Sequence, residues 1–509
     1  YGILHITSKM AAYTSSLWTN HQQFFNHIKF VLIFSAGYLL CIIALKSNLF
    51  NRKTAVSAMF VICVCEIFVN SSVFIGNAAN TDKLFQTTMQ LENAINDNEY
   101  CRVKMDKKYM HANMIGALGY NTLGHYTSFT GQDYIFTMKK LGYSSYWMEV
   151  GSNGGTRITD AILSNKYSIG SKSFTQKYAE LTYTNSMFNI YRNELCLPMG
   201  TILSENLTKN KIISFTDRIS VQEYYAKEFL GDESIVQNYD YKRLYKTNYS
   251  SQGGMHSFSR QNADSTDSSI LYEFYVSGNQ ELYLDIFNEL TTETWESHYK
   301  SVAVYVNGIE IENEYPTQID NGFLRLGTFN NENITVKIKL LNDFSVKSFG
   351  VFGVNLDKLS TSLDKMNTVE VTHDKNKLYA ECDAKDGEYL YLSVPYEKGF
   401  TVTNNGEQVK ALKANGCFTA IKLNEGSNKI KFTFYPQGFK LGTVISIVGM
   451  VLCAVFVLII KKTRLSKSVA VYAGKAINLI FSTAFFAVIA IIYIMPVLIS
   501  IAGYFKKLL

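Results

Sequence analysis

The 509-residue sequence contains only five prolines and three tryptophans, and it lacks several motifs that mark common enzymes. No GK[ST] follows a strand-like run, which excludes a phosphate-binding P-loop. Cys63 and Cys65 lie two apart in an apolar run with no histidine nearby, which is not the spacing of a zinc site. A Ser-His-Asp order and paired carboxylates at helical spacing are also missing. The sequence therefore predicts no metal site and shows no cofactor motif.

The cysteines, the net charge and the first residue further limit which kinds of protein the sequence can describe. A disulfide between Cys382 and Cys417 is open, although free buried thiols are the favoured interpretation. The formal net charge of +6 comes largely from two short basic loops beside apolar runs, so it indicates topology and not nucleic-acid binding. The chain begins at Tyr1 without Met or a signal peptide, so we expect a piece of a longer protein.

Long apolar runs are what the sequence has in abundance. A helix needs ~20 such residues to cross a bilayer, and four runs come near this length. The predicted fold class is therefore membrane α-helical with four spans and a large extracytoplasmic insert. Residues 1–27 are expected to form an interfacial or outer tail. Two transmembrane helices are expected within 28–74 (28–45 and 55–74) and two more within 441–502 (441–460 and 477–502).

Basic residues give the predicted orientation. Lys46, Arg52 and Lys53 follow the first run without an acidic residue, and the run at 441–460 is followed by KKTRLSK. Loops enriched in Lys and Arg stay on the cytoplasmic side. Both basic loops are then cytoplasmic, which places residues of about 78–438 outside the membrane.

The spacing of apolar residues changes along the predicted extracytoplasmic insert. Residues 78–236 mix helical and strand-like runs and predict a small α/β domain, with a helix at 218–231, and 237–269 are expected to be a linker. Beyond this point apolar residues alternate, which predicts two β-sandwich-like modules at 270–362 and 368–436. Hairpin turns are expected at Asn307-Gly308, Asp386-Gly387, Asn405-Gly406 and Asn415-Gly416.

The second apolar run contains an acidic residue and an amide. Glu66 and Asn70 lie one helical turn apart and share a face. A carboxylate inside a membrane is costly and marks a functional candidate by default. The alternative is a neutral Glu66 that forms a hydrogen bond with Asn70 or with a neighbouring helix. An ion or proton pathway built on Glu66 would need more intramembrane charge than the sequence has.

The loop HANMIGALGYNTLGHYTSFTG, at 111–131, is the candidate for substrate binding. Its four glycines allow close backbone approach, and its other residues supply neutral hydrogen-bonding groups and rings. Such a set suits sugars and other polyols, which offer hydroxyl groups and weakly apolar faces. In the alternative interpretation, these groups satisfy one another at a domain junction. The candidate residues are His111, Asn113, Tyr120, Asn121, His125, Tyr126 and Ser128.

A weaker candidate is the stretch 142–167, in which Glu149 precedes a flexible SNGG and Asp160 follows it. Three isolated histidines, His256, His298 and His373, are interpreted as ordinary surface residues. The sequence assigns none of these positions a catalytic role.

Several short stretches in a fixed order carry a resemblance to a known family. They are CEIFVNS, then GYNTLGHYTSFTG, ITDAILSNKYSI, FNIYRNELCLPMG and VPYEKGFTV, and finally FYPQGFKLG. In this order the chain resembles the C-terminal part of the YfhO family of bacterial multi-pass membrane proteins. The resemblance implies a glycosyltransferase-like protein of the GT-C architecture in the bacterial cell membrane.

The resemblance also implies a reaction. A sugar would pass from a polyprenyl-phosphate donor to a cell-envelope polymer such as lipoteichoic acid at the outer face. The catalytic acid of GT-C enzymes is expected in a first external loop that would precede this chain, so no catalytic residue is assigned. The alternative is a non-catalytic, membrane-anchored envelope protein whose outer β modules bind glycan or protein. The expected partners are membrane lipid and an envelope glycopolymer, without nucleic acid.

Overall fold

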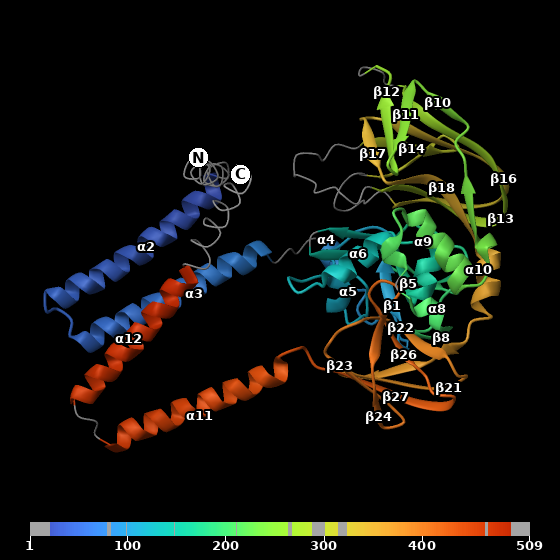
Figure 1. Ribbon diagram of the computed structural model, residues 1–509. Coiled ribbons are helices and arrows are strands. Elements are labelled where there is room, and N and C mark those ends of the chain that lie inside the picture. The colour runs from blue at the N-terminus through green and yellow to red at the C-terminus, as the bar shows by residue number, and fades with distance from the viewer. Residues whose placement is uncertain are drawn as a thin grey trace, which may run out of the picture. The chain divides into compact units, whose positions relative to one another are not determined.

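The structure is a computed structural model that consists mainly of β-sheet (Figure 1). In the described residues the strands form six sheets. The chain divides into two compact units, of which the first comprises Tyr1–Asn96, Met114–Tyr120 and Ser168–Arg192, and the second the remaining residues. The structure describes residues 21–78, 83–97, 99–146, 148–209, 211–262, 267–287, 301–313, 323–463 and 467–489.

The prediction of a membrane α-helical fold with four spans is wrong. Among the described residues, only Phe439–Ile459, with a mean hydropathy of 2.7, forms a helix long and apolar enough to cross a bilayer. The apolar segments Phe30–Lys46 and Gly474–Ala487 are shorter than the ~20 residues of a span, and the run at 55–74 is interrupted by polar residues. Residues 490–502 of the fourth predicted span lie outside the described part. The apolar runs are conspicuous in the sequence, but most of the chain between them is strand.

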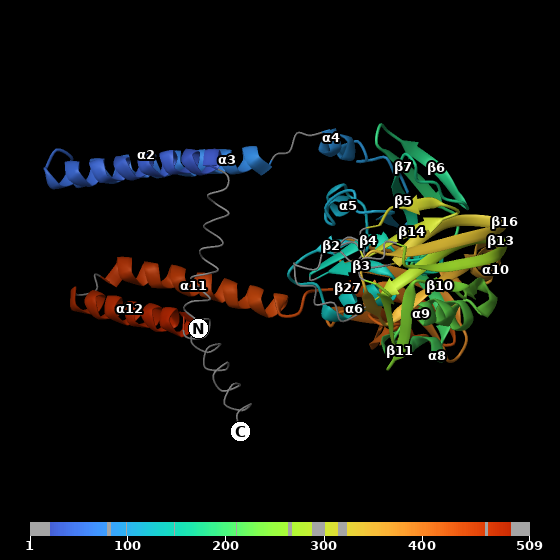
Figure 2. The ribbon, with the colours of Figure 1, turned by 90° about the horizontal axis from the view of Figure 1, so that it is seen from above.

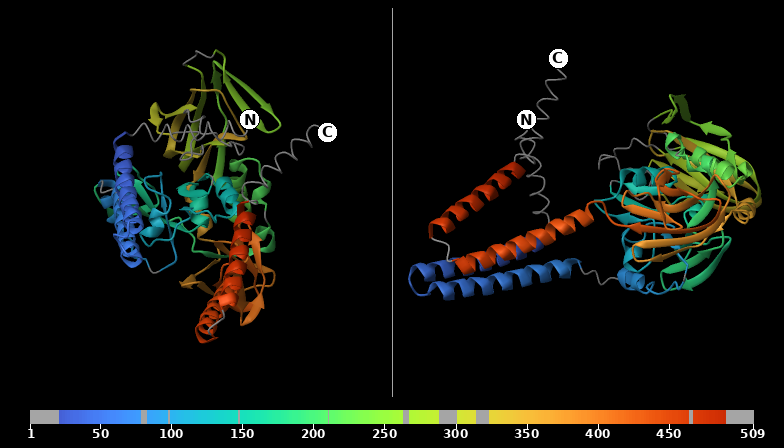
Figure 3. Two further views of the ribbon diagram at one scale, coloured as in Figure 1. Left: turned by 90° about the vertical axis from the view of Figure 1, so that its left-hand side faces the viewer. Right: turned by 60° about the horizontal axis from the view of Figure 1, so that its bottom comes forward.

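Two long helices, α2 (His21–Lys46) and α3 (Arg52–Ala78), form an antiparallel hairpin in the first unit (Figures 1 and 3). Gly37 permits their close approach, because a Cβ atom there would lie 3.3 Å from Cδ1 of Ile62. Of the predicted tail, residues 1–20 lie outside the described residues, and the remaining residues begin α2.

Short elements complete the first unit. Strands β6 and β7 are neighbours in one sheet, joined by a tight turn (Figure 2). The Asn185 carboxamide in this turn accepts a hydrogen bond from Phe188 N at 2.8 Å and donates one to Thr87 O at 3.1 Å. The turn is thereby fixed to the helical segment before it. The elements are α4 (Lys83–Met89), α5 (Met114–Ala117), β5 (Asn165–Ser171), β6 (Ala179–Thr184) and β7 (Phe188–Asn193).

A small three-stranded sheet in the order β2-β4-β3 begins the second unit. A buried network holds its surroundings together, because the Asp160 carboxylate accepts hydrogen bonds from Lys104 Nζ at 2.9 Å and from the Tyr143 hydroxyl at 2.7 Å. This network ties β1, β3 and α7 into one rigid support. The elements are β1 (Arg102–Met105), β2 (His125–Tyr126), α6 (Gln132–Lys140), β3 (Tyr143–Tyr146), β4 (Glu149–Gly154) and α7 (Arg157–Ile162).

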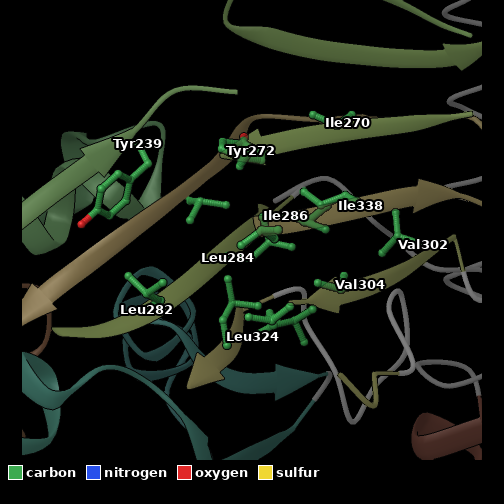
Figure 4. Packing of buried hydrophobic residues seen from close by; sticks show 14 of the residues in the cluster. Tyr239, Ile270, Tyr272, Leu282, Leu284, Ile286, Val302, Val304, Leu324 and Ile338 are labelled. Carbon is green, nitrogen blue, oxygen red and sulfur yellow. The ribbon is translucent and has the colours of Figure 1, made fainter. Parts of the chain in front are cut away.

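The largest sheet has the order β15-β14-β16-β13-β18-β9, with β10 also paired to β13. Its core follows the predicted alternation, since Leu282, Leu284 and Ile286 of β13 are fully buried against Val302 and Val304 of β14 (Figure 4). The strands are β9 (Val236–Tyr239), β10 (Arg243–Tyr245), β13 (Ser269–Phe287), β14 (Val302–Val306), β15 (Ile309–Ile311), β16 (Phe323–Leu340) and β18 (Ser348–Asn355).

Two five-stranded sheets share one hydrophobic cluster, which includes Leu390 and Phe432. β8 belongs to the first of them, although it comes from the segment 78–236 that was predicted to be a separate domain. The first sheet has the order β19 (Thr368–Val369), β8 (Gly200–Ser204), β22 (Glu388–Pro395), β26 (Phe418–Lys422) and β25 (Ala411–Ala414). The second has the order β20 (Val371–Asp374), β21 (Lys377–Ala384), β27 (Gly426–Phe434), β23 (Phe400–Asn404) and β24 (Glu407–Val409).

The helix predicted at 218–231 is present in two parts. Asp217 caps α9 by accepting a hydrogen bond from Ser220 N at 2.7 Å, the chain continues as the π-helix η2, and Gly231 (φ 74°) follows it. The remaining helices are α8 (Glu205–Thr208), η1 (Ile212–Ser214), α9 (Arg218–Tyr224), η2 (Tyr225–Phe229), η3 (Glu233–Ile235), α10 (Leu356–Leu363), α11 (Phe439–Thr463) and α12 (Lys467–Ile489).

Residues 237–269 differ from the linker that their composition predicts. They hold most of β9, the whole of β10, and a hairpin of β11 (Thr247–Gln252) and β12 (Met255–Arg260), which is extended by β17 (Phe344–Val346). This segment is rich in Ser, Asn, Asp and Gly, so it lacks the aliphatic alternation by which a strand is recognised. The hairpin is held by hydrogen-bonded pairing of its strands and not by buried aliphatic side chains on both strands.

Candidate functional site

Side chains from three segments meet at one edge of the sheet β2-β4-β3. Tyr126 on β2 lies directly opposite Glu149 on β4, so their side chains share a face. Lys108, in the loop after β1, forms a half-buried ion pair with Glu149. The His111 ring contacts the Tyr126 ring edge-to-face, with the centroids 6.1 Å apart. These contacts form a continuous surface from the ion pair to the imidazole.

Asn113 holds this surface in place. Its Nδ2 donates a hydrogen bond to Tyr126 O at 3.0 Å, and its Oδ1 accepts one from Tyr126 N at 2.7 Å. Its backbone N donates to Nδ1 of His111 at 3.2 Å. Because both ends of the carboxamide bind the Tyr126 backbone, Asn113 positions the two rings.

Close backbone approach, as predicted, is required at one glycine of the loop. A Cβ atom at Gly124 would lie 2.8 Å from the backbone N of Ser152, so only glycine allows β2 to lie against β4 here. At Gly116 and Gly131, by contrast, no heavy atom lies within 4 Å of such a Cβ. The other glycines of the loop therefore do not share this requirement.

Phe129 is the most exposed large hydrophobic residue near the site, with 95% of its surface accessible. Its loop is fixed by hydrogen bonds, since Phe129 N donates to Thr127 Oγ1 at 3.3 Å and Thr130 Oγ1 donates to Met148 O at 3.1 Å. The ring is thus held in water by an ordered loop. Sequence reasoning did not select Phe129, because an isolated Phe predicts burial; the signal was its place between polar residues in a glycine-bounded loop.

Three predicted residues of the loop do not join the ring surface. The half-buried His125 stacks on Tyr134 with centroids 5.3 Å apart, and burial lowers the pKa of its imidazole. The Asn121 side chain donates to Cys101 O at 3.3 Å. Ser128 is exposed beside Phe129. His125 and Asn121 therefore have structural contacts, which the mixed polar composition of the loop did not distinguish from binding groups.

The remaining predicted residues belong to the first unit. The Tyr120 hydroxyl donates to Leu91 O at 2.5 Å and accepts from Ile95 N at 3.1 Å, which makes it a structural residue. Glu66 is half-buried and accepts a hydrogen bond from the Tyr38 hydroxyl of α2 at 2.8 Å. This contact favours the interpretation in which Glu66 forms a hydrogen bond that links two neighbouring helices. The side chain of Asn70 lies outside the described part of the structure.

The cysteines offer little reactivity. All eight are free thiols, so the open question of a Cys382–Cys417 disulfide is answered against it. Burial raises the pKa of Cys382 to about 11 and that of Cys417 to about 12, which keeps both thiols protonated at neutral pH. In the described residues no group of three or more His, Cys, Asp or Glu side chains is placed to hold a metal ion.

The family described as "Bacterial membrane protein YfhO" matches residues 2–446 of the sequence. The chain belongs to this family. A relative named "Uncharacterized protein YfhO" from Bacillus subtilis (strain 168) is 30% identical over 137 residues, which are 25% of this chain and 16% of that protein. The match therefore spans less than a fifth of the length of this YfhO relative. Membership of YfhO makes the chain a bacterial membrane protein, in agreement with the apolar helix Phe439–Ile459.

Solved structures show only weak likeness to this YfhO chain. An arabinofuranosyltransferase AftD from Mycobacteria is 10% identical, with 38% of this chain and 22% of that chain covered and a TM-score of 0.13. A conserved protein of unknown function from Pseudomonas aeruginosa PAO1 is 10% identical, with 40% and 93% covered and a TM-score of 0.14. A Paenibacillus xanthan lyase is 8% identical, with 39% and 26% covered and a TM-score of 0.15. At these scores no argument about function rests on them.

Proposed function

We propose that this YfhO chain is part of a glycosyltransferase-like membrane protein that transfers a sugar from a polyprenyl-phosphate donor to a cell-envelope polymer such as lipoteichoic acid. In this proposal the surface of Lys108, His111, Tyr126, Phe129 and Glu149 binds the acceptor glycan. Membership of a bacterial membrane protein family supports the location. The observation that carries the proposal is the pair of exposed rings, Tyr126 and Phe129, held on fixed backbone beside polar groups.

The chemistry of the surface matches a polyol. A sugar ring has a C–H face that packs on an aromatic ring and a rim of hydroxyl groups that needs donors and acceptors. Phe129 and Tyr126 supply ring faces, and His111 supplies an imidazole. The Lys108–Glu149 pair offers both a donor and an acceptor without adding net charge. Such a surface discriminates by hydroxyl pattern more than by charge.

We place residues of about 78–438 on the outer side of the membrane. Lys461, Lys462 and Lys467 follow the apolar helix Phe439–Ile459, and cationic residues next to a span favour the cytoplasmic side. The sheets that precede this helix are then outside. Lipid-linked sugars are the donors that remain available there, in accordance with the polyprenyl-phosphate expectation.

The reaction itself requires a base outside this surface. Transfer needs a carboxylate that accepts the proton of the acceptor hydroxyl while its oxygen attacks the anomeric carbon and the polyprenyl phosphate leaves. Glu149 is the carboxylate of the surface, and it is occupied by Lys108. We therefore assign this surface to holding the acceptor, and the base to another part of the full-length protein.

The same observation favours the alternative function, a non-catalytic envelope protein that binds glycan. A binding surface needs rings and hydrogen-bonding groups but no unpaired acid, and the Lys108–Glu149 pair meets that condition. The two functions differ in whether the polymer is modified when the surface is intact.

The test uses Phe129→Ala and Tyr126→Ala in the full-length protein, with sugar content of the envelope polymer, binding of the polymer and membrane abundance as readouts. Phe136→Ala is the matched control, because Phe136 is also exposed (41%) but lies on α6. We expect the first two variants to lower polymer glycosylation at unchanged abundance and the control to leave it unchanged. Lost polymer binding with unchanged glycosylation would select the non-catalytic function. If neither changed, both functions would be refuted for this surface.

A further inference from the structure

A second group of exposed rings lies on the hairpin of β11 and β12, beside β17 (Figure 1), and at Tyr241, which precedes β10. The Tyr241 and Tyr249 rings meet edge-to-face with centroids 6.3 Å apart, and the His256 ring stacks on Tyr249 at 6.1 Å. Tyr241 is 38% and Tyr249 37% exposed. Three rings in contact therefore form one accessible row, which we call the hairpin row (Tyr241, Tyr249 and His256).

The strand register fixes the hairpin row. Tyr249 lies opposite Phe258 and Ser251 opposite His256, so these four side chains share one face of the hairpin. Phe258 is 1% exposed and packs against Tyr249 at 5.0 Å, which anchors the row to the hydrophobic core. The Tyr249 hydroxyl and His256 Nδ1 are hydrogen-bonded at 2.9 Å, which limits rotation of both rings. The row is thus ordered before any ligand arrives.

The opposite face of the hairpin is covered by hydroxyl and amide groups. Asn248 pairs with Ser259 and Ser250 with Ser257 across the strands, and Ser257 Oγ lies 2.8 Å from Oγ of Ser345 on β17. From Thr247 to Phe258 the sequence has no Asp, Glu, Lys or Arg. This stretch supplies neither the cations that bind phosphate groups nor the aliphatic surface that enters a bilayer. Charged residues stand outside it, at Lys246 and Arg260 and on either side of Tyr241.

We propose that the hairpin row binds an uncharged polysaccharide, with sugar rings packed on Tyr241 and Tyr249 and sugar hydroxyl groups bonded to His256 and Ser251. Neutral sugars need ring faces together with uncharged donors and acceptors, and the hairpin presents both. This site is separate from the Phe129 surface and does not depend on sugar transfer. It gives the protein a second binding site for a glycan chain.

One other occupant deserves a direct comparison. In the described residues β11 is an edge strand of its sheet, and its sequence TNYSSQ has no charge or proline that would oppose pairing with another strand. A second copy of the chain could use that edge. Pairing of edges uses backbone groups, whereas a polysaccharide uses the rings, so ring substitutions distinguish the two.

The experiment is native affinity electrophoresis of the detergent-solubilised full chain in gels that contain dextran, hydroxyethyl cellulose or, as an anionic comparison, polygalacturonate. We expect a neutral polysaccharide to retard the chain and polygalacturonate not to do so. Tyr241→Ala and Tyr249→Ala should each weaken retardation about tenfold, the scale of losing one aromatic contact. Tyr249→Phe should retain most of it, because the ring remains.

The controls make the outcome decisive. Tyr275→Ala removes another exposed tyrosine (53%) on β13, outside the hairpin, and should leave retardation unchanged. Absence of retardation by both neutral polysaccharides, or equal loss in Tyr275→Ala, would overturn the proposal. Loss in Phe129→Ala but not in Tyr249→Ala would move the binding to the other surface and also overturn it. A concentration-dependent dimer that forms without polysaccharide and persists in the ring variants, together with absent retardation, would replace it with self-association through β11.

Discussion

Glu281 shows how strongly a single charge is bound inside the large sheet. Its side chain is 3% exposed and pairs with Arg325 Nε at 3.0 Å, while the Tyr283 hydroxyl donates to it at 2.6 Å. Burial alone would raise the pKa of Glu281, but the positive charges of Arg325 and Arg157 outweigh burial and hold the pKa at about 2. The carboxylate is therefore charged at every physiological pH.

The substitution Glu281→Gln tests this network. It removes this counter-charge from the buried Arg157 and the partly exposed Arg325, and we expect a loss of about 3 kcal/mol in unfolding free energy. Because the folded pKa lies below the unfolded one, the wild-type contribution is present above pH ~4.5 and is lost as pH falls toward 2. Denaturant unfolding at several pH values measures both effects. Glu273→Gln, which breaks the exposed Lys242 pair, is the control and should leave the midpoint nearly unchanged. An equal loss in both variants would contradict the account.

His125 predicts a dependence on pH nearer neutrality. Burial lowers the pKa of its imidazole, so the unfolded chain takes up a proton first as pH falls below ~6.5. The contribution of His125 to stability is then fully present above pH ~6.5 and is lost as pH falls toward the lower pKa of the folded state. His125→Gln should flatten the slope of melting temperature against pH between 7 and 5, and His111→Gln, at an exposed histidine, should not. An unchanged slope in His125→Gln would refute the assignment.

The sequence predicted part of the site for a physical reason. His111, Asn113 and Tyr126 were selected because polar and aromatic residues gathered in one glycine-rich loop, and that loop folds back on itself in the structure. The ion pair of Lys108 with Glu149 was not predicted, because it joins the loop after β1 to β4 across 41 residues of sequence. A pairing between distant segments leaves no trace in local composition.

At the scale of elements, the Asn-Gly dipeptides were accurate markers. Asn307-Gly308, Asn405-Gly406 and Asn415-Gly416 each join two paired strands, and all six residues have positive φ. Asp386-Gly387 fails, because β21 and β22 on either side belong to different sheets. Asn-Gly requires a turn geometry that closes a hairpin, whereas Asp-Gly here only redirects the chain. Local sequence indicates the turn, but the sheets decide which strands pair.

Two of these turns form a matched pair for mutation. Gly406 and Gly416 have φ of 88° and 89°, but a Cβ atom meets nothing within 4 Å at Gly406 and lies 2.5 Å from Thr137 Cγ2 at Gly416. Gly406→Ala should cost about 1–2 kcal/mol from backbone strain. Gly416→Ala should cost about 1–3 kcal/mol more because of overpacking. Thr137→Ala, measured with Gly416→Ala in a double-mutant cycle, should recover part of the difference. Equal costs at both glycines would exclude the steric effect.

At the scale of the whole molecule, the apolar composition gave a wrong number of membrane spans, whereas the alternation of apolar residues correctly predicted strands. Four apolar runs suggested four spans, whereas in the described residues only Phe439–Ile459 meets the length and hydropathy of a span. Alternation in β13 and β14 predicted the large sheet, but the polar strands of 237–269 gave no such signal. Burial of apolar residues can be predicted from the sequence, but pairing between polar strands cannot.

The proposed orientation makes a prediction for the intact membrane protein. With the exposed Cys65 and Cys453 replaced by serine, Thr361→Cys on the exposed side of α10 should react with a membrane-impermeant maleimide in whole cells. Thr463→Cys, at the end of α11 beside the basic residues, should react only after lysis. Reaction of Thr463→Cys alone before lysis would reverse the orientation, and reaction of both would contradict it.

The central claim is that the surface around Tyr126 and Phe129 contacts a glycan. In the same serine background, Ser128→Cys places a thiol beside Phe129 without removing either ring, and its rate of maleimide labelling reports contact with added envelope polymer. Thr361→Cys serves as the remote control. The account predicts that the polymer slows labelling at position 128 and leaves that at position 361 unchanged. Equal rates with and without polymer at position 128 would contradict it.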